Sequence, residues 1–243
     1  MSVASVSYDF LDPGRATAKA GATARVHAAL REAIVSLEFR PGEALDKQAI
    51  AARLGVSRFP VGEAMTRLAA EGLVDIIPQS GSRVALIKIS DARENMFLRR
   101  ALEMEAVRSL APAGNAGLIE TLRQNLNYQM AAIAAGDRNG FHDFDLAFHA
   151  LLLDRLGFER VRSAADTARL GLERVRRMLN SRRRQEDSLA EHERIVEALE
   201  ARDATGAALA MELHLGSVMT ELEAFARLRP ELFADLNTGD TPQ

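Results

Sequence analysis

Four side chains in the second half of the chain have the types and spacing of a metal site: Asp145, His149, His192 and His214. The chain has only five histidines, and three of them lie on otherwise apolar faces of expected helices. Burial of such polar groups is costly unless they are paired or bound to a metal. One carboxylate and three imidazoles suit Zn²⁺, Ni²⁺, Mn²⁺ or Fe²⁺. The pattern therefore predicts a divalent metal ion as cofactor, with zinc, nickel and manganese as the leading candidates.

Helical spacing puts each of these groups in line with apolar residues. Asp145 and His149 are four residues apart and share one helix face. A capping box, Ser188 with Glu191, is expected to begin the fifth helix of this half and puts His192 in its first turn. The apolar residues in line with the four groups are Phe141, Phe148, Leu152, Ile195, Val196, Leu199, Met211, Leu215, Val218 and Leu222.

A simpler interpretation stays open for each group taken alone. A single buried histidine is more often a hydrogen-bonded core residue than a metal ligand. Asp145 and His149 together form a helix pair worth only ~0.3 kcal/mol if no metal is bound. His142 and His27 have no partner that the sequence identifies. An arginine-rich stretch is typical of a solvated helix face or a loop, although one member that points inward could help to hold an acid. Its arginines are Arg174, Arg176, Arg177, Arg182, Arg183 and Arg184.

Near the N-terminus, capping signals predict two helices joined by a short turn. Asp46 can cap the first helix, and Gly55 can close it in the left-handed conformation. Ser57 is placed to cap the second helix, whose first turn tolerates Pro60. A tight helical corner that projects Arg58 from the start of its second helix suits the DNA major groove. The pattern predicts that the chain binds double-stranded DNA.

Elements on both sides extend this corner to a winged helix. Upstream, Val26, Leu30, Ile34 and Leu37 recur at helical spacing, and Pro41-Gly42 is expected to stop that helix. Downstream, the β-branched runs 73–77 and 83–87 are joined by a turn that contains Pro78 and Gly81, which is a hairpin signal. The expected fold class is mostly α, with an N-terminal winged helix-turn-helix and a C-terminal all-α antiparallel helical bundle.

The expected domains follow from these elements and from the helix signals downstream. They are a flexible N-terminal tail over 1–20, a winged helix-turn-helix DNA-binding domain over 21–88, an all-helical metal-binding, effector-binding and dimerisation domain over 89–228, and a C-terminal tail over 229–243. Caps and breakers divide the helical domain into six helices, at roughly 91–111, 116–135, 138–154, 158–180, 188–202 and 204–227.

Composition agrees with two ordinary domains in 243 residues. The absence of cysteine excludes disulfides and thiolate metal sites and fits the cytoplasm. No apolar run approaches ~20 residues, so no membrane partner is expected. Although the net charge is −3, residues 15–88 hold 11 Lys and Arg against 7 Asp and Glu. A locally basic N-terminal module suits attraction to phosphates.

The N-terminal stretch, residues 22–88, resembles the GntR family of bacterial regulators. The resemblance rests on the segment 54–68, on Glu71-Gly-Leu-Val74 and on the wing Gly81-Ser-Arg-Val84. It implies that Arg58 contacts guanine O6 and N7, while Ser57 and Arg67 contact phosphates. The full set expected at the DNA interface is Gln48, Ser57, Arg58, Pro60, Arg67, Gly81 and Arg83.

The chain departs from that family at three positions. Gly62 stands where the family commonly has an arginine, four residues after Arg58, so one base contact is lost. Glycine there also costs the helix ~1 kcal/mol relative to alanine. Gln48 replaces an arginine of some members, and Phe158 stands where relatives often carry asparagine. The operator sequence therefore cannot be borrowed from relatives.

The second half resembles the FCD effector domain of the FadR subfamily, nearest to its six-helix, VanR-type group. The matching segments are 145–149, 191–199, Asp203 with His214, and Arg99-Arg-Ala-Leu-Glu103. In many such domains the aspartate and three histidines coordinate a divalent metal, and small carboxylates bind at its open positions. The resemblance implies that Asp145, His149, His192 and His214 are metal ligands. It makes Arg99 the partner of the effector carboxylate.

The sequence thus predicts a cytoplasmic, homodimeric transcriptional regulator that is not an enzyme and whose operator affinity responds to a small organic acid. A dimer is expected because a two-fold operator needs two copies of the recognition helix. Two alternatives stay open. A metal-dependent, hydrolase-like enzyme could use the open metal position to activate water, although no further catalytic base is evident. A direct metal sensor would respond to the ion itself.

Overall fold

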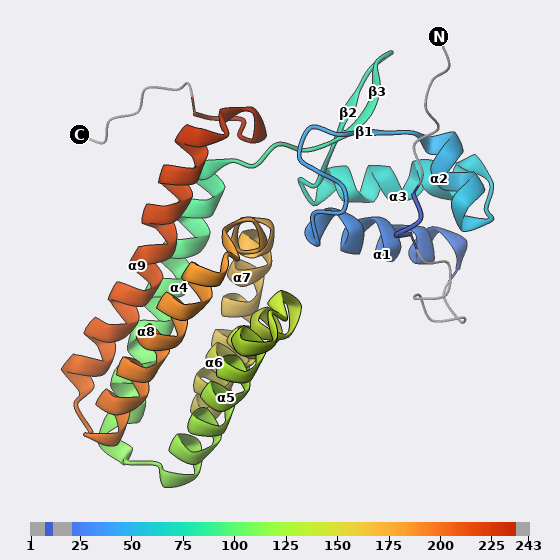
Figure 1. Ribbon diagram of the computed structural model, residues 1–243. Helices are drawn as coiled ribbons and strands as arrows, with labels where there is room; N and C mark the ends of the chain where they lie inside the picture. The colour runs from blue at the N-terminus through green and yellow to red at the C-terminus, as the bar shows by residue number, and fades with distance from the viewer. Residues whose placement is uncertain (1–7, 12–20, 237–243) are drawn as a thin grey trace. The chain divides into compact units, whose positions relative to one another are not determined.

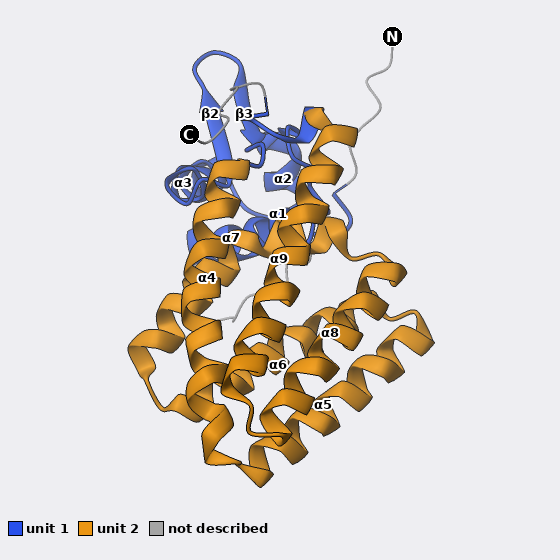
Figure 2. Cartoon of the chain, turned by 90° about the vertical axis from the view of Figure 1, so that its left-hand side faces the viewer, with its two compact units in different colours: residues 1–87, 231–237 blue, residues 88–230, 238–243 orange. Residues whose placement is uncertain are grey.

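The computed structural model describes residues 8–11 and 21–236, with the elements labelled in Figure 1. The chain forms two compact units, coloured separately in Figure 2. Of the described residues, 8–11, 21–87 and 231–236 belong to the first unit, and 88–230 belong to the second. Among the described residues, none of the helices combines the length and the apolar character that are needed to cross a bilayer.

The helices of the first unit confirm the helical corner. They are α1 (Ala22–Val35), α2 (Lys47–Leu54) and α3 (Arg58–Ala70). The Asp46 carboxylate accepts hydrogen bonds from the backbone N–H groups of Gln48 and Ala49, at 2.8 and 3.2 Å. Gly55 ends α2 at φ 63°, a left-handed conformation that favours glycine. The chain can therefore turn into α3 within three residues.

A three-stranded antiparallel sheet completes the first unit, in the order β1-β3-β2. Its strands are β1 (Ala44–Leu45), β2 (Val74–Ile77) and β3 (Gly81–Val84). Ile77 pairs with Gly81 at the tip of the predicted hairpin, where Gly81 has φ 97°. The second run of the hairpin starts two residues earlier than predicted, and β1 was not anticipated because two residues carry no alternation signal.

Three expectations for this unit are corrected. Helix α1 ends at Val35 rather than at Pro41-Gly42, because Leu37 adopts φ 66°. The predicted flexible tail over 1–20 is wrong for Tyr8 and Leu11, which are buried in the core of the unit. The Tyr8 carbonyl accepts a hydrogen bond from Arg53 Nε at 3.0 Å. The rest of that tail, 1–7 and 12–20, lies outside the described residues.

The predicted C-terminal tail over 229–243 is ordered in its first part. A 3₁₀ helix, η2 (Pro230–Leu232), leads into a bridge between Phe233 and Ile87. The Ile87 N–H donates to the Leu232 carbonyl at 3.0 Å, and the Ala234 N–H donates to the Ile87 carbonyl at 2.9 Å. Phe233 is buried. The remainder, 237–243, lies outside the described residues.

The second unit is helical throughout its described part and contains the expected number of six α-helices. Asn115, Asp137 and Asp203 cap three of them with their side chains. The helices are α4 (Ile89–Leu110), α5 (Ala116–Ala135), α6 (Arg138–Leu156), α7 (Glu159–Leu179), α8 (Arg182–Glu200) and α9 (Ala204–Leu228), with a 3₁₀ turn η1 (Ala111–Ala113) after α4.

These helices surround a common interior. Helix α4 packs against α6, α7 and α9, while α5 packs against α6 and α8. The pairs α4–α9 and α5–α6 can be followed in Figure 1. The ion pair of Arg93 with Glu223, at 3.0 Å, and the pair of Arg100 with Glu212 show that α4 and α9 run antiparallel. Side chains from α4, α6, α8 and α9 can therefore meet inside the bundle.

Helix α8 begins earlier than predicted, and this changes the site. Its N-cap is Ser181, whose hydroxyl accepts from the Arg184 backbone N–H at 3.2 Å, so the predicted cap at Ser188 is wrong. Ser188 is buried in mid-helix, and its hydroxyl accepts from the Arg184 guanidinium at 2.8 Å. The extra turns carry Arg184 into the bundle rather than into a loop.

Candidate metal centre and DNA-binding surface

The four predicted metal ligands come together in the interior of the second unit. All are buried, and one ligand atom of each lies within 4.8 Å of the others. His214 Nε2 lies 3.3 Å from His149 Nε2 and 3.3 Å from His192 Nε2. Asp145 Oδ1 lies 3.7 Å from His192 Nε2. Helices α6, α8 and α9 thus each direct at least one ligand toward the same point.

Each imidazole is oriented by a partner on its other nitrogen. His149 Nδ1 lies 2.5 Å from Glu103 Oε2, and His192 Nδ1 lies 2.9 Å from Gln129 Oε1. The third pair is His214 Nδ1 with Glu191 Oε2, at 2.8 Å. The oxygens of Gln129 and Glu191 accept from Nδ1 of His192 and His214, and the Glu103 carboxylate beside His149 Nδ1 favours the proton on that nitrogen. Each Nε2 then presents a lone pair.

The Nε2 lone pair of His214 faces those of His149 and His192 at 3.3 Å, and lone pairs cannot hydrogen-bond to each other. A cation between them removes the conflict, and an outer partner on each histidine is the usual arrangement around a bound metal. The residues therefore fit a divalent ion.

The electrostatics of the three rings suit the same role. Burial lowers the pKa of His149 to about 4. Burial and then the neighbouring imidazoles hold the pKa values of His192 and His214 well below the usual range. All three rings are accordingly neutral at pH 7, which is the form that binds a metal. Burial opposes ionisation of Glu103, but the positive charge of Arg99 holds its pKa well below the ordinary value.

Sequence reasoning missed the outer partners, although one had a readable signal. Arg99 and Glu103 are four residues apart on α4, and the guanidinium donates to both carboxylate oxygens, at 2.8 and 3.4 Å. That spacing is typical of a helical ion pair. Gln129 had no comparable signal, because its partner His192 is far away in the chain and on another helix.

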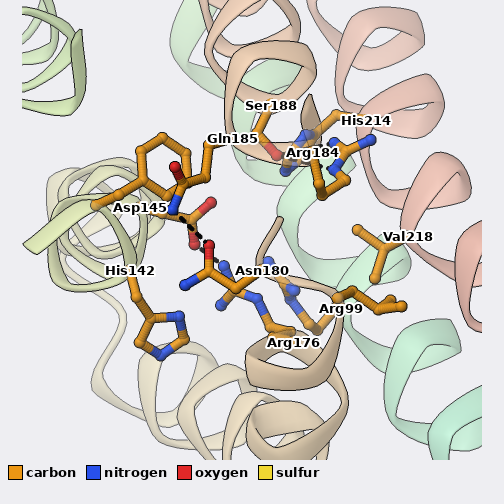
Figure 3. A pocket seen from close by; sticks show the side chains of 12 residues that line it. Arg99, His142, Asp145, Arg176, Asn180, Arg184, Gln185, Ser188, His214 and Val218 are labelled. Carbon is orange, nitrogen blue, oxygen red and sulfur yellow. Dashed lines mark hydrogen bonds and ion pairs between the residues drawn. The ribbon is translucent and has the colours of Figure 1, made fainter. Parts of the chain in front are cut away.

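A small cavity of about 40 Å³ is lined by two of the four ligands, Asp145 and His214, as Figure 3 shows. By the usual allowance of ~10–15 Å³ for one water, it has room for only a few. Its lining includes Asp145, His214 and three arginines: Arg99, Arg176 and Arg184. Arg176 contacts Asp145 from the adjacent helix α7. Because guanidinium groups bind carboxylates and other anions, an anion is the ligand that this cavity lining favours.

The three arginines differ in how fully they are paired. Arg99 is bound to Glu103, and Arg184 donates to Ser188 and contacts Glu191. Nη1 of Arg176 is buried and has no hydrogen-bond partner among the described residues. Burial and then the charge of Arg99 lower the Arg176 pKa to about 9, so it remains a cation at pH 7.

Two expectations about this region are corrected. The arginine-rich stretch is not uniformly solvated, because Arg176 and Arg184 point inward while Arg182 and Arg183 are exposed. His142 has a partner: its Nε2 lies 2.5 Å from Glu173 Oε1 in a buried pair beside the cavity. His27 likewise lies 2.6 Å from Glu71 in the first unit.

The residues predicted to contact DNA lie on three elements of the first unit. Six are exposed on α2, on the start and outer face of α3, and on β3: Gln48, Ser57, Arg58, Arg67, Gly81 and Arg83. Pro60 is the exception. Its ring is buried in the core side of α3, so it cannot contact DNA. Phe59 beside Arg58 is 74% exposed, and a Cβ added at Gly62 would meet nothing within 4 Å. The outer face of α3 is therefore open.

Both units match known protein families. Residues 22–84 match the bacterial regulatory proteins of the gntR family, and residues 94–217 match the FCD domain. The second match alone includes every predicted metal ligand and Arg99.

Two curated relatives match nearly end to end. An HTH-type transcriptional regulator in an unstable DNA locus of Streptomyces ambofaciens is 33% identical over 86% of this chain and 88% of its own. The HTH-type transcriptional repressor RspR of Escherichia coli K12 is 30% identical over 87% of this chain and 93% of its own.

Solved structures share the fold. A GntR transcriptional regulator from Rhodococcus sp. RHA1 superposes with a TM-score of 0.65 at 28% identity and covers 83% of this chain and 97% of its own. E. coli McbR/YncC has a TM-score of 0.63 at 19% identity, over 87% of this chain and 99% of its own, and supports the fold alone.

Proposed function

The chain belongs to the GntR family of bacterial regulatory proteins and carries an FCD domain, and from this premise we propose that a small organic acid controls its binding to operator DNA. It is a transcriptional regulator by family, and its named relatives are regulators rather than enzymes. The acid would bind beside a divalent ion held by Asp145, His149, His192 and His214. As a regulator of bacterial promoters, the protein would act in the cytoplasm.

The observation that carries the proposal is the convergence of three Nε2 atoms next to an arginine-lined cavity. When bound there, a divalent ion supplies open coordination positions for a carboxylate. The arginine wall supplies the opposite charge for an acid. Zinc, nickel and manganese all accept nitrogen and oxygen ligands of this kind.

The test combines two measurements on one preparation. Elemental analysis of the purified protein should find about one divalent ion per chain, and a thermal melt against a panel of small acids should find members that stabilise it. An acid that also releases the protein from operator DNA supports the proposal. Release that tracks free metal and ignores every acid would instead favour a direct metal sensor. Hydrolysis of ester substrates by the metal-loaded protein would favour the enzyme alternative.

For the DNA surface we propose a division of roles among the exposed residues. Arg58 at the start of α3 reads a base, since a guanidinium matches guanine O6 and N7. Ser57 and Arg67 contact phosphates. The wing is expected to approach the duplex through Gly81 and Arg83. Gln48 on α2 is expected to contact the sugar–phosphate backbone of the same operator.

Arg58→Ala should weaken binding to the operator by about 1–3 kcal/mol and relax the preference at one position. Arg67→Ala should instead weaken specific and random DNA alike and reduce the salt slope by about one charge. Fluorescence anisotropy on both DNAs at several salt concentrations separates the two. Equal losses on operator and random DNA for Arg58→Ala would reject its base-reading role.

We further propose that the protein is a homodimer, formed through the neighbouring helices α4 and α9. Large apolar side chains are exposed on both: Phe97 and Leu98 on α4, and Leu209 and Leu213 on α9. Large apolar side chains that are exposed on neighbouring helices are typical of an interface.

The double variant Phe97→Glu, Leu213→Glu should therefore sediment as a monomer at concentrations where the native protein is a dimer, because it buries charge in the interface. Met130→Glu, at an exposed position on α5, is the matched control and should leave the dimer intact. A double variant that stays dimeric would place the interface elsewhere.

A further inference from the structure

The cavity is bordered by arginine–carboxylate pairs whose formal charges cancel one by one. The pairs are Arg99 with Glu103, Arg184 with Glu191, and Arg176 with Asp145. All six side chains are largely buried. A buried charge without a partner is strongly unfavourable, so any charge added here needs compensation.

Asp145 contacts both the ligand cluster and Arg176. Its Oδ1 lies 3.7 Å from His192 Nε2 in the ligand cluster, and its other oxygen, Oδ2, contacts Arg176. A divalent ion at the cluster adds two positive charges, while Asp145 and Arg176 already neutralise each other. The site with its ion would therefore have an excess of two positive charges, which an anion with two negative charges would balance.

Arg176 offers such an anion a guanidinium nitrogen that makes no hydrogen bond in the described structure. Two nitrogens of Arg99 already donate to Glu103, and Arg184 donates to Ser188 and contacts Glu191. Nη1 of Arg176 is buried without a hydrogen-bond partner in the described structure. Figure 3 shows the Arg176 side chain at the cavity with its head toward Asp145.

We propose that the effector is a short dicarboxylate, with one carboxylate at the metal centre and the other bound by Arg176. This deepens the proposed function and rests on it. The chain between the two carboxylates must be short, because the single carboxylate of Asp145 already reaches both the ligand cluster and Arg176. The cavity of about 40 Å³ sets the same limit.

Calorimetric titration of the protein as purified, with its metal content measured, tests this with matched pairs of acids. The first pair is malonate and acetate, and the second is succinate and propionate. In each pair the monocarboxylate is the dicarboxylate with one carboxylate replaced by hydrogen. At least one dicarboxylate should bind about 10- to 100-fold more tightly than its monocarboxylate counterpart, the usual contribution of a hydrogen-bonded charge pair.

Substitution of Arg176 separates its contribution from chelation of the metal by both carboxylates. Arg176→Gln should lose the 10- to 100-fold advantage of the dicarboxylate and leave monocarboxylate affinity within about threefold. Arg176→Lys, which keeps the positive charge, should retain part of the dicarboxylate advantage. Arg177→Gln is the control, since Arg177 binds Glu173 outside the cavity. Metal content and melting temperature of each variant show whether it is folded and loaded.

The outcomes separate this inference from its premise. If monocarboxylates bind the native protein as tightly as dicarboxylates, the inference is wrong while acid control of DNA binding stands. A dicarboxylate advantage that survives in folded, metal-loaded Arg176→Gln also overturns it, because chelation alone then explains the preference. Binding of no acid of either class to the metal-loaded protein overturns the proposed function, and this inference with it.

Discussion

Chelation of the metal should lower the melting temperature of this protein by about 10 °C, and His214→Ala should do nearly the same without a chelator. A ligand that binds only the folded state at about 1,000 times its dissociation constant stabilises that state by about 4 kcal/mol. For a chain of this size, each kcal/mol shifts the melting temperature by about 2–4 °C. Differential scanning calorimetry before and after chelation, with elemental analysis, measures the effect.

His214 should be the most sensitive ligand because it is central to the cluster. Its Nε2 lies 3.3 Å from the Nε2 atoms of both other histidines, and its Nδ1 is fixed by Glu191. His142→Ala is the matched control, since His142 is equally buried but pairs with Glu173 rather than with the cluster. It should lose stability through that pair and still retain the metal.

One result would contradict the assignment of the site. The quadruple variant Asp145→Ala, His149→Ala, His192→Ala, His214→Ala should contain no stoichiometric metal, because every ligand atom is removed. Full occupancy in that variant would place the ion elsewhere.

The sequence predicted the parts of this site that depend on local periodicity. Asp145 and His149 are recognisable as polar groups on an apolar helical stripe, and the same reasoning located His192 and His214. The corner at Gly55 and the cap at Asp46 were also readable, since each is set by residues within one turn of the chain. Local signals of this kind survive into the folded structure when the core does not oppose them.

The remaining parts depend on contacts between distant segments. Ser188 has the sequence features of a helix cap, but Ser181 is the N-cap of α8. The Ser188 hydroxyl instead accepts a hydrogen bond from the Arg184 guanidinium. Nothing within α7 marks Arg176 as different from Arg177. Only the packing of α7 against the interior turns one guanidinium toward Asp145 and leaves the other bound to Glu173. Pro60 was misassigned for a related reason, since the core of the first unit covers the face of α3 on which it lies.

The chain connection between the units would give a bound acid a route to the DNA. Helix α4 begins at Ile89, shortly after β3 ends at Val84, and it carries Arg99 and Glu103. Glu103 lies against His149, so an acid bound at the proposed metal centre would act on α4 through the ligand cluster. A shift of α4 in each protomer would change the spacing of the two recognition helices. Operator half-sites one helical turn apart tolerate little such change.

The acid should therefore bind more weakly to DNA-bound protein than to free protein, by the same factor by which it weakens DNA binding. This equality follows from thermodynamic linkage, and coupling between two sites typically amounts to about 5- to 150-fold. Calorimetric titration of the acid found in the melt into protein with and without operator measures one side, and DNA affinity with and without the acid measures the other. Glu103→Gln should reduce the coupling more than it reduces acid affinity, because it alters the link between α4 and His149 and leaves the four ligands in place. Arg182→Gln, an exposed substitution at the start of α8, should change neither. Identical acid affinity in the presence and absence of operator would refute the coupling, even if metal and acid both bind.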